Sequence, residues 1–210
     1  VHITGIAVAS GLGGTVGEHL DAIAAGSPGL RRLSGFPEPL PAGSAHLDLL
    51  AGWISDRTTW FRGRRYGAAS NAAVRAARIA AEDAGWSRDD LADAWVFAGS
   101  SHANAGAQFR ASNSLHSEVA AAVSIELGIR GPWQMLANGC SAGLDALGMA
   151  WMALRSGSAR RALVIGVELP LIPALLDGFT ASGLLAPPES VRDPYHHETG
   201  GFIGGEGVAA

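Results

Sequence analysis

The chain alternates between short apolar runs and segments with helical periodicity over nearly its whole length. Four apolar runs have the length of single strands and are bounded by turn-forming or polar residues: 3–9, 95–98, 133–137 and 162–167. Segments in which apolar residues recur every three or four positions separate them. Strands that alternate with helices in this way predict an α/β fold with a mostly parallel sheet. We find no short internal repeat.

Four helices are predicted around these strands. The first begins at Thr15, which forms a capping-box pattern with Glu18, and it ends near residue 25. The next two span about 59–84 and about 115–127. The helix at 59–84 has one narrow alanine-rich face and a polar face with Arg64, Arg75, Arg78 and Glu82. Residues 26–52, which contain several prolines and glycines, are predicted to be a surface loop.

The fourth helix follows Cys140 and extends to Leu154. Its apolar side chains cover every face of the helix: Leu144, Leu147, Met149, Trp151, Met152 and Leu154. A helix with this pattern is expected to be buried on all sides, as in the middle layer of a large fold.

Composition and charge exclude several classes of function. The net charge of −4 offers no electrostatic basis for binding nucleic acid. All 15 basic residues are arginine, which excludes lysine Schiff-base chemistry and a lysine-dependent phosphate loop. A single cysteine forms no internal disulfide and favours a reducing, cytoplasmic location. No segment approaches the roughly 20 apolar residues that cross a bilayer, so no membrane association is expected.

Cys140 is the strongest candidate for chemistry. It follows an apolar run that ends in Asn138-Gly139, and a helix of small residues begins directly after it. A thiol at a helix N-terminus lies at the positive end of the peptide dipoles, which favours the nucleophilic thiolate. The competing interpretation is a small, buried core residue, because free cysteine is commonly buried. The accessible turn built from Gly139 and Gly143 favours the nucleophile.

Six segments match one known family in their order and spacing: residues 3–8, 12–16, 80–85, 128–132, 139–143 and 201–207. Together they resemble the N-terminal half of a β-ketoacyl synthase, the condensing enzyme of fatty-acid and polyketide assembly. Residues 140–148 are most similar to the discrete ketosynthases of type II polyketide systems. The resemblance implies a thiolase-like fold of α/β/α/β/α layers around a buried central helix. Residues 1–210 would form the N-terminal domain of that fold.

The resemblance also implies roles for individual residues. Cys140 would accept an acyl chain as a thioester from an acyl carrier protein, without a cofactor or metal. The carbanion from a decarboxylated malonyl-carrier would then attack this thioester, and the Cys140 N–H would donate to the oxyanion. Arg64 and Arg65 match a basic pair that helps to dock the acidic carrier protein. Their alternative role is a solvated helix face.

The chain departs from the family pattern in several places. The family's two decarboxylating histidines and its second oxyanion donor lie in the C-terminal half, and none of the seven histidines here matches them. His196 and Gly200 stand where aspartates are usual, and the stretch between Gly99 and Leu115 is shorter than usual. We therefore expect a C-terminal half or a partner ketosynthase subunit, in a homo- or heterodimer. A half fold alone would expose apolar surface along the sheet and central helix.

Three other interpretations remain. Residues 139–143 also fit the G-x-S-x-G pattern of serine hydrolases, with Ser141 as nucleophile. Asp177 or Asp193 with His196 or His197 would then complete a triad. The chain could instead be a non-catalytic partner that resembles a chain-length factor, although such partners usually lack the cysteine. Adjacent histidines suggest a metal site only weakly, because no further ligands accompany them.

Overall fold

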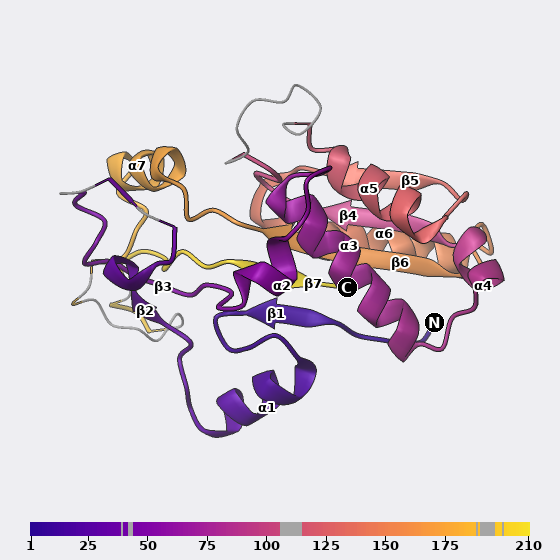
Figure 1. Cartoon of the computed structure of the whole chain (residues 1–210), viewed down its shortest axis with the longest axis horizontal. Helices are drawn as coiled ribbons and strands as arrows, with labels where there is room; N and C mark the ends of the chain where they lie inside the picture. Colours follow the sequence, from indigo (N-terminus) through magenta and orange to yellow (C-terminus); the bar gives the residue numbers. More distant parts are fainter. Residues whose placement is uncertain (39, 42–43, 106–114, 188, 190–195, 199) are drawn as a thin grey trace.

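A computed structural model describes residues 1–38, 40–41, 44–105, 115–187, 189, 196–198 and 200–210. Its centre is a five-stranded mixed sheet with the strand order β1-β7-β6-β4-β5 (Figure 1). The strands are β1 (Val8–Ser10), β4 (Trp95–Gly99), β5 (Trp133–Leu136), β6 (Ala162–Glu168) and β7 (Gly207–Ala209). β4 pairs in parallel with β5 and β6, whereas β7 is antiparallel to β1 and β6. The predicted parallel pairing thus applies to the part of the sheet that leads into Cys140.

Helices cover both faces of this sheet. α3 (Ala68–Asp83) and α5 (Glu118–Leu127) pack on one face, and α6 (Ala142–Arg155) packs on the other (Figure 1). Successive side chains of a strand point to opposite faces. Accordingly, Val96 and Ala98 join the core under α3 and α5, whereas Phe97 joins the core under α6. The described residues form an α/β/α sandwich, and no second sheet among them covers α6.

The expectation that the helix after Cys140 is buried on all sides is not met within this chain. Ala142, Ala146 and Ala150 are buried against the sheet. The opposite side of α6 is exposed and apolar, with Leu144 71% and Trp151 53% exposed, and Leu147 and Met152 beside them. The structure therefore confirms that this chain alone exposes apolar surface along the central helix.

The predicted long helix at 59–84 is wrong, because the structure contains two helices there. α2 (Arg57–Phe61) ends at Arg62, and α3 begins after Gly67. The segment between them wraps around Asn71, whose amide donates to the carbonyl oxygens of Phe61 and Tyr66 at 3.2 and 3.1 Å. A side chain at Gly63 would collide with this amide, so the glycine permits the close approach. This tertiary contact outweighs helical propensity at the break.

The predicted loop at 26–52 contains regular structure. β2 (Arg31–Arg32) and β3 (Leu50–Ala51) form a small antiparallel pair, with a 3₁₀ turn at Leu33–Gly35. Leu33, Phe36 and Trp53 form a second apolar cluster with Leu176 of α7 (Pro173–Ala181). The short strands lack the alternation that identifies longer ones, so pattern alone does not reveal them.

Two further helices complete the fold. α1 (Val16–Ala24) begins as predicted, with the Thr15 hydroxyl accepting from the Glu18 N–H at 3.2 Å. Hydrogen bonds from Gly14 and Thr15 lower the pKa of the Glu18 carboxyl. α4 (Arg88–Ala92) is a short helix with a capping box at Ser87.

No helix in the described ranges combines the length and hydropathy that a membrane span requires.

Candidate functional site

Cys140 lies in a sharp turn between β5 and α6. The 3₁₀ turn Gly139–Ser141 joins the strand to the helix, and Gly139 has a φ of +79°. This left-handed conformation disfavours other residues, so the glycine lets the chain reverse directly before the thiol. Cys140 is exposed, which excludes the interpretation of a buried core residue. The turn thus presents the thiol to solvent at the N-terminal end of α6.

Small residues allow α6 to lie directly on the sheet behind this turn. A Cβ atom at Gly99 would be 2.2 Å from the carbonyl oxygen of Ala142, and one at Gly143 would be 3.9 Å from the Cα atom of Gly166. The backbone at the start of α6 is therefore in close contact with the ends of β4 and β6. This packing fixes the position of the Cys140 turn relative to the carboxyl edge of the sheet.

A group of polar side chains braces the turn from outside. The Ser141 hydroxyl donates to the Asp145 carboxylate at 2.8 Å, and the Asn138 amide donates to the same carboxylate. These contacts join the residue before Gly139 to the first turn of α6. Sequence reasoning missed this group. The signal that could have found it is the pair Asn138 and Asp145, an amide and a carboxylate seven residues apart that flank the thiol.

The same edge of the sheet carries a second polar group that sequence reasoning missed. Glu168 is the last residue of β6, and its carboxylate accepts from the backbone N–H groups of Ser101 and His102 at 2.6 and 3.2 Å. The Nδ1 atom of His102 lies 3.1 Å from the same carboxylate. Glu168 ends β6, and His102 follows the end of β4. Both residues therefore lie at the carboxyl ends of strands that the sequence predicts to be parallel, where functional side chains of α/β folds gather.

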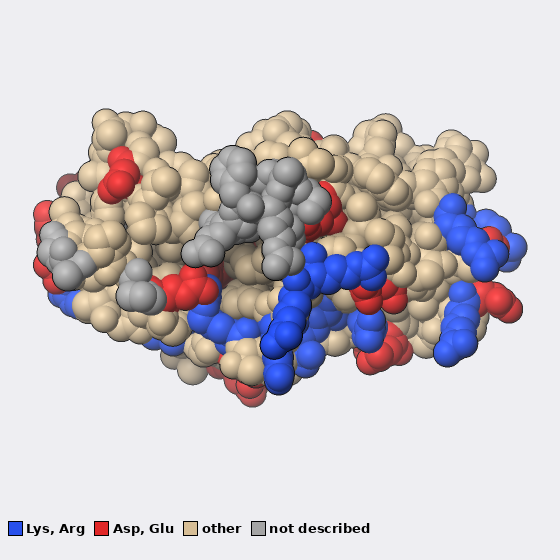
Figure 2. Space-filling view, turned by 45° about the horizontal axis from the view of Figure 1, so that its top comes forward, with Lys and Arg blue, Asp and Glu red and all other residues tan. Residues whose placement is uncertain are grey.

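Arg64 and Arg65 lie in the connection between α2 and α3, not on a helix face as predicted. With Arg62, Arg75 and Arg78 they line a groove of about 330 Å³. Figure 2 shows basic side chains gathered near the middle of this side of the molecule. Arg65 contacts Glu126 of α5 at 3.4 Å, and its guanidinium lies 5.2 Å from the Tyr66 ring centre. The groove is strongly basic although the whole chain carries a net charge of −4.

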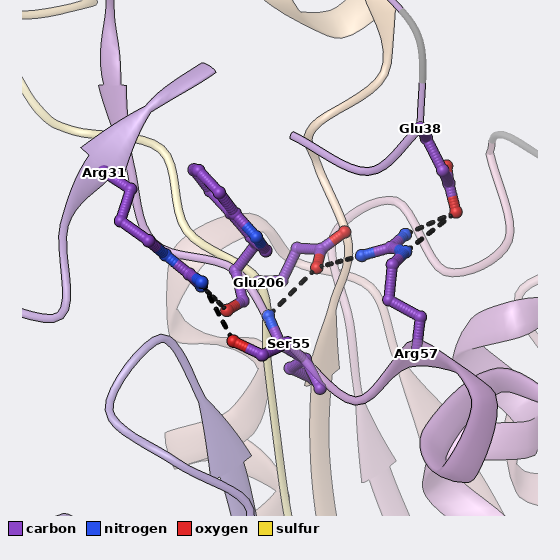
Figure 3. Close-up of polar contacts among 7 residues, drawn as sticks. Arg31, Glu38, Ser55, Arg57 and Glu206 are labelled. Atoms are coloured by element: carbon purple, nitrogen blue, oxygen red, sulfur yellow. Dashed lines mark hydrogen bonds and ion pairs between the residues drawn. The ribbon is translucent and has the colours of Figure 1, made fainter. Parts of the chain in front are cut away.

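A buried ion pair ties the glycine-rich segment before β7 to the body of the fold (Figure 3). Nη1 of Arg57 donates to Oε2 of Glu206 at 2.6 Å, and the Ile54 N–H donates to the same oxygen at 3.2 Å. Arg57 also donates to Glu38 through Nε at 3.0 Å. The segment 201–207 is one of the six that match the family pattern. The ion pair between Glu206 and Arg57 therefore fixes this segment to the body of the fold.

The groups required by the serine-hydrolase interpretation do not meet in the described residues. Ser141 bonds to Asp145, and Asp177 bonds to Nε2 of His46 at 2.7 Å. Asp193 and most of the short stretch after Gly99 lie outside the described residues. His196 and His197 stack on each other at 4.5 Å. Across the described ranges, no three His, Cys, Asp or Glu side chains form a group that could hold a metal ion.

Two sequence comparisons place the chain among known proteins. The family described as "Beta-ketoacyl synthase, N-terminal domain" matches residues 1–210. A 3-oxoacyl-[acyl-carrier-protein] synthase 2 of Staphylococcus aureus is 30% identical over 89 residues, which cover 41% of this chain and 22% of that protein. The matched segment thus spans under a quarter of the length of this curated relative.

Solved structures of ketosynthases share the fold. The ishigamide ketosynthase/chain length factor has a TM-score of 0.78 at 24% identity, covering 99% of this chain and 56% of that chain. A type II polyketide ketosynthase, AntDE, in complex with its acyl-carrier protein AntF has a TM-score of 0.74 at 22% identity, with the same coverage. The thiolase-like α/β architecture expected from the sequence is therefore confirmed for this chain.

Proposed function

The chain belongs to the β-ketoacyl synthase family, and from this premise we propose that it is the acyl-accepting half of a carrier-dependent condensing enzyme. The observation that carries the proposal is the exposed Cys140 in a glycine turn at the N-terminal end of α6. The thiolate attacks the carbonyl carbon of an acyl thioester on the carrier protein. The Cys140 N–H donates to the oxyanion of the tetrahedral intermediate, and the carrier thiolate leaves.

Condensation requires groups that a second polypeptide or further sequence supplies. The decarboxylation of malonyl-carrier uses the family's two histidines, and none of the histidines of this chain stands at a matching position. The exposed side of α6, with Leu144, Leu147, Trp151 and Met152, is the surface that this second half covers. Burial of so much apolar side-chain area gives a strong driving force for tight association. The result is a homo- or heterodimer of ketosynthase type.

Acyl loading of the wild-type chain tests the proposal directly. The purified protein is incubated with a carrier protein that bears an acyl thioester, and its intact mass is measured. A gain of one acyl group, located on the peptide that contains Cys140, supports the proposal. Native mass spectrometry of the same sample establishes whether a second chain of about equal size is bound. An unmodified chain bound to an active ketosynthase would instead support a role like that of a chain-length factor.

The docking role of Arg64 and Arg65 gives a second prediction. Replacement of both by glutamate is expected to weaken carrier binding at least about tenfold, because two attractive contacts with an acidic partner become repulsive. This loss of affinity for the carrier protein should become smaller as salt is added, since salt screens exposed charges. Surface plasmon resonance with the carrier protein measures both effects. Arg155→Glu, on the far end of α6, is the matched control. Equal affinities for wild type and the double variant would show that these arginines are only a solvated surface.

A further inference from the structure

The basic groove carries more arginines than the pair Arg64 and Arg65 that matches the family. Its wall also contains Arg75 and Arg78 of α3, whose side chains are exposed. Residues three positions apart on a helix lie on the same side of it, one turn from each other. No family motif found in the sequence includes Arg75 or Arg78. This α3 pair is therefore a feature of the chain that the resemblance does not explain.

The charges that line the groove are far from balanced. Five arginines line it, and among the described lining residues Glu126 of α5 is the one carboxylate. Nη1 of Arg65 already contacts that carboxylate at 3.4 Å. Within the described ranges, no hydrogen bond or ion pair engages the side chains of Arg62, Arg64 and Arg78. The groove thus holds an excess of positive charge that its own residues do not neutralise.

Packing positions these arginines before a partner binds. The Asn71 amide fixes the connection between α2 and α3 through the carbonyl oxygens of Phe61 and Tyr66. The Arg75 guanidinium lies 5.4 Å from the centre of the buried Trp60 ring, whose face attracts a cation. A side chain restrained in this way loses less rotamer entropy when it binds an anion. The groove therefore has the properties of a prepared site for an anionic partner.

The dimensions of the groove favour carboxylates that a helix presents. Its volume of about 330 Å³ is smaller than one turn of an α-helix with side chains, which occupies about 400 Å³. The backbone of a helical partner therefore stays outside, and only its side chains enter. Acidic residues three or four positions apart on a helix have Cβ atoms roughly 5–6 Å apart, the same separation as in the α3 pair. Two carboxylates on one face of a helix can thus meet both arginines.

We propose that Arg75 and Arg78 are a second contact site for an acidic helix of the carrier protein, in addition to Arg64 and Arg65. The identity of the partner rests on the proposed function, whereas the preference for an acidic helix rests on the groove itself. The Glu126 carboxylate opposes this binding, because it adds a negative charge to the groove. A partner must therefore engage several arginines at once to bind well.

Charge reversal of the α3 pair separates this contact site from the family pair. Arg75→Glu/Arg78→Glu is expected to weaken binding of the carrier protein at least about tenfold, because two attractive contacts become repulsive. Combined with reversal of Arg64 and Arg65, it should weaken binding further than either double variant alone. Surface plasmon resonance measures these affinities, and circular dichroism checks that each variant is folded.

Glu126→Gln is expected to have the opposite effect. The change removes a negative charge from the groove and keeps an oxygen that accepts from the Tyr66 hydroxyl, so the carrier protein should bind about threefold more tightly. Loss of a merely structural contact would not raise the affinity. The matched control is Arg155→Glu/Arg160→Glu, which makes the same change of charge outside the groove and should bind like the wild type.

A short helical peptide with glutamates along one face tests the site without a carrier protein. It should bind in a manner that depends on Arg75 and Arg78, and more tightly than a peptide of the same composition with scattered glutamates. If Arg75→Glu/Arg78→Glu loses no more affinity than the control, the second contact site is wrong, although docking on Arg64 and Arg65 stands. Tighter binding of inorganic phosphate than of the helical peptide would likewise overturn the proposal. Binding of the peptide by a chain that binds no carrier protein would support the acidic-helix site and reject the proposed function alone.

Discussion

Arg57→Ala is expected to lower the free energy of unfolding by about 3–5 kcal/mol, the usual effect of removing one member of a buried ion pair. The Glu206 side chain is only 2% exposed, and Arg57 is its cationic partner at 2.6 Å. Without the Arg57 guanidinium, the buried Glu206 carboxylate keeps the hydrogen bond from the Ile54 N–H but loses its ion-pair partner. A loss of this size is a large share of the 5–15 kcal/mol that stabilises a typical domain.

The pH dependence of this loss follows from the pKa of Glu206. Burial raises the pKa of this carboxyl, and the opposing effect of Arg57 does not fully offset it. A carboxyl whose folded-state pKa is raised destabilises the folded protein at higher pH, and this cost disappears as the pH falls and the group takes up a proton. The loss in the free energy of unfolding caused by Arg57→Ala should therefore be smaller near pH 5 than near pH 7.

Urea denaturation followed by tryptophan fluorescence measures the free energy of unfolding of the wild type and of Arg57→Ala at both pH values. Glu206→Gln is the informative companion, because it removes the charge and keeps the shape and an oxygen for the Ile54 N–H. The double variant Arg57→Ala/Glu206→Gln should be more stable than Arg57→Ala alone, since no charge is then left buried without a partner. If the double variant is no more stable than the single one, the charge of Glu206 is not the cause of the loss.

Cys140→Ala is expected to abolish acyl uptake from the carrier protein. No other cysteine is present, so no second thiol can form a thioester. Cys140→Ser should also fail to load at neutral pH, because a hydroxyl ionises far less readily than a thiol. Intact mass measurement after incubation with an acyl-carrier quantifies the loss, which should exceed about 1,000-fold in initial rate for a nucleophile removed outright.

Ser141→Ala is the control for the neighbouring hydroxyl. Its bond to Asp145 braces the turn, so we expect a modest fall in loading and no loss of the thioester itself. A fluorophosphonate probe should leave the wild type unlabelled. Labelling of Ser141, or loading that survives Cys140→Ala but not Ser141→Ala, would favour the hydrolase interpretation over the ketosynthase.

Local patterns in the sequence identified most elements that lead to the site. The apolar runs at 95–98, 133–137 and 162–167 correspond to β4, β5 and β6, and the glycine turn before Cys140 is formed as predicted. These features depend on residues close together in the chain, where strand alternation, helix capping and the conformational freedom of glycine act directly. The family resemblance could be detected in the sequence for the same reason, because its motifs are short segments that follow one another in a fixed order.

Contacts between distant residues decided the rest. The break between α2 and α3 depends on the side chain of Asn71, and it moved Arg64 and Arg65 off the predicted helix face and into the wall of a basic groove. The bond between His102 and Glu168 joins residues 66 positions apart, and that between Arg57 and Glu206 joins residues 149 apart. The sequence by itself determined β4, β5 and β6 and the glycine turn before Cys140. Only the tertiary structure decided which charged groups meet, because strand order brings together side chains that no local pattern connects.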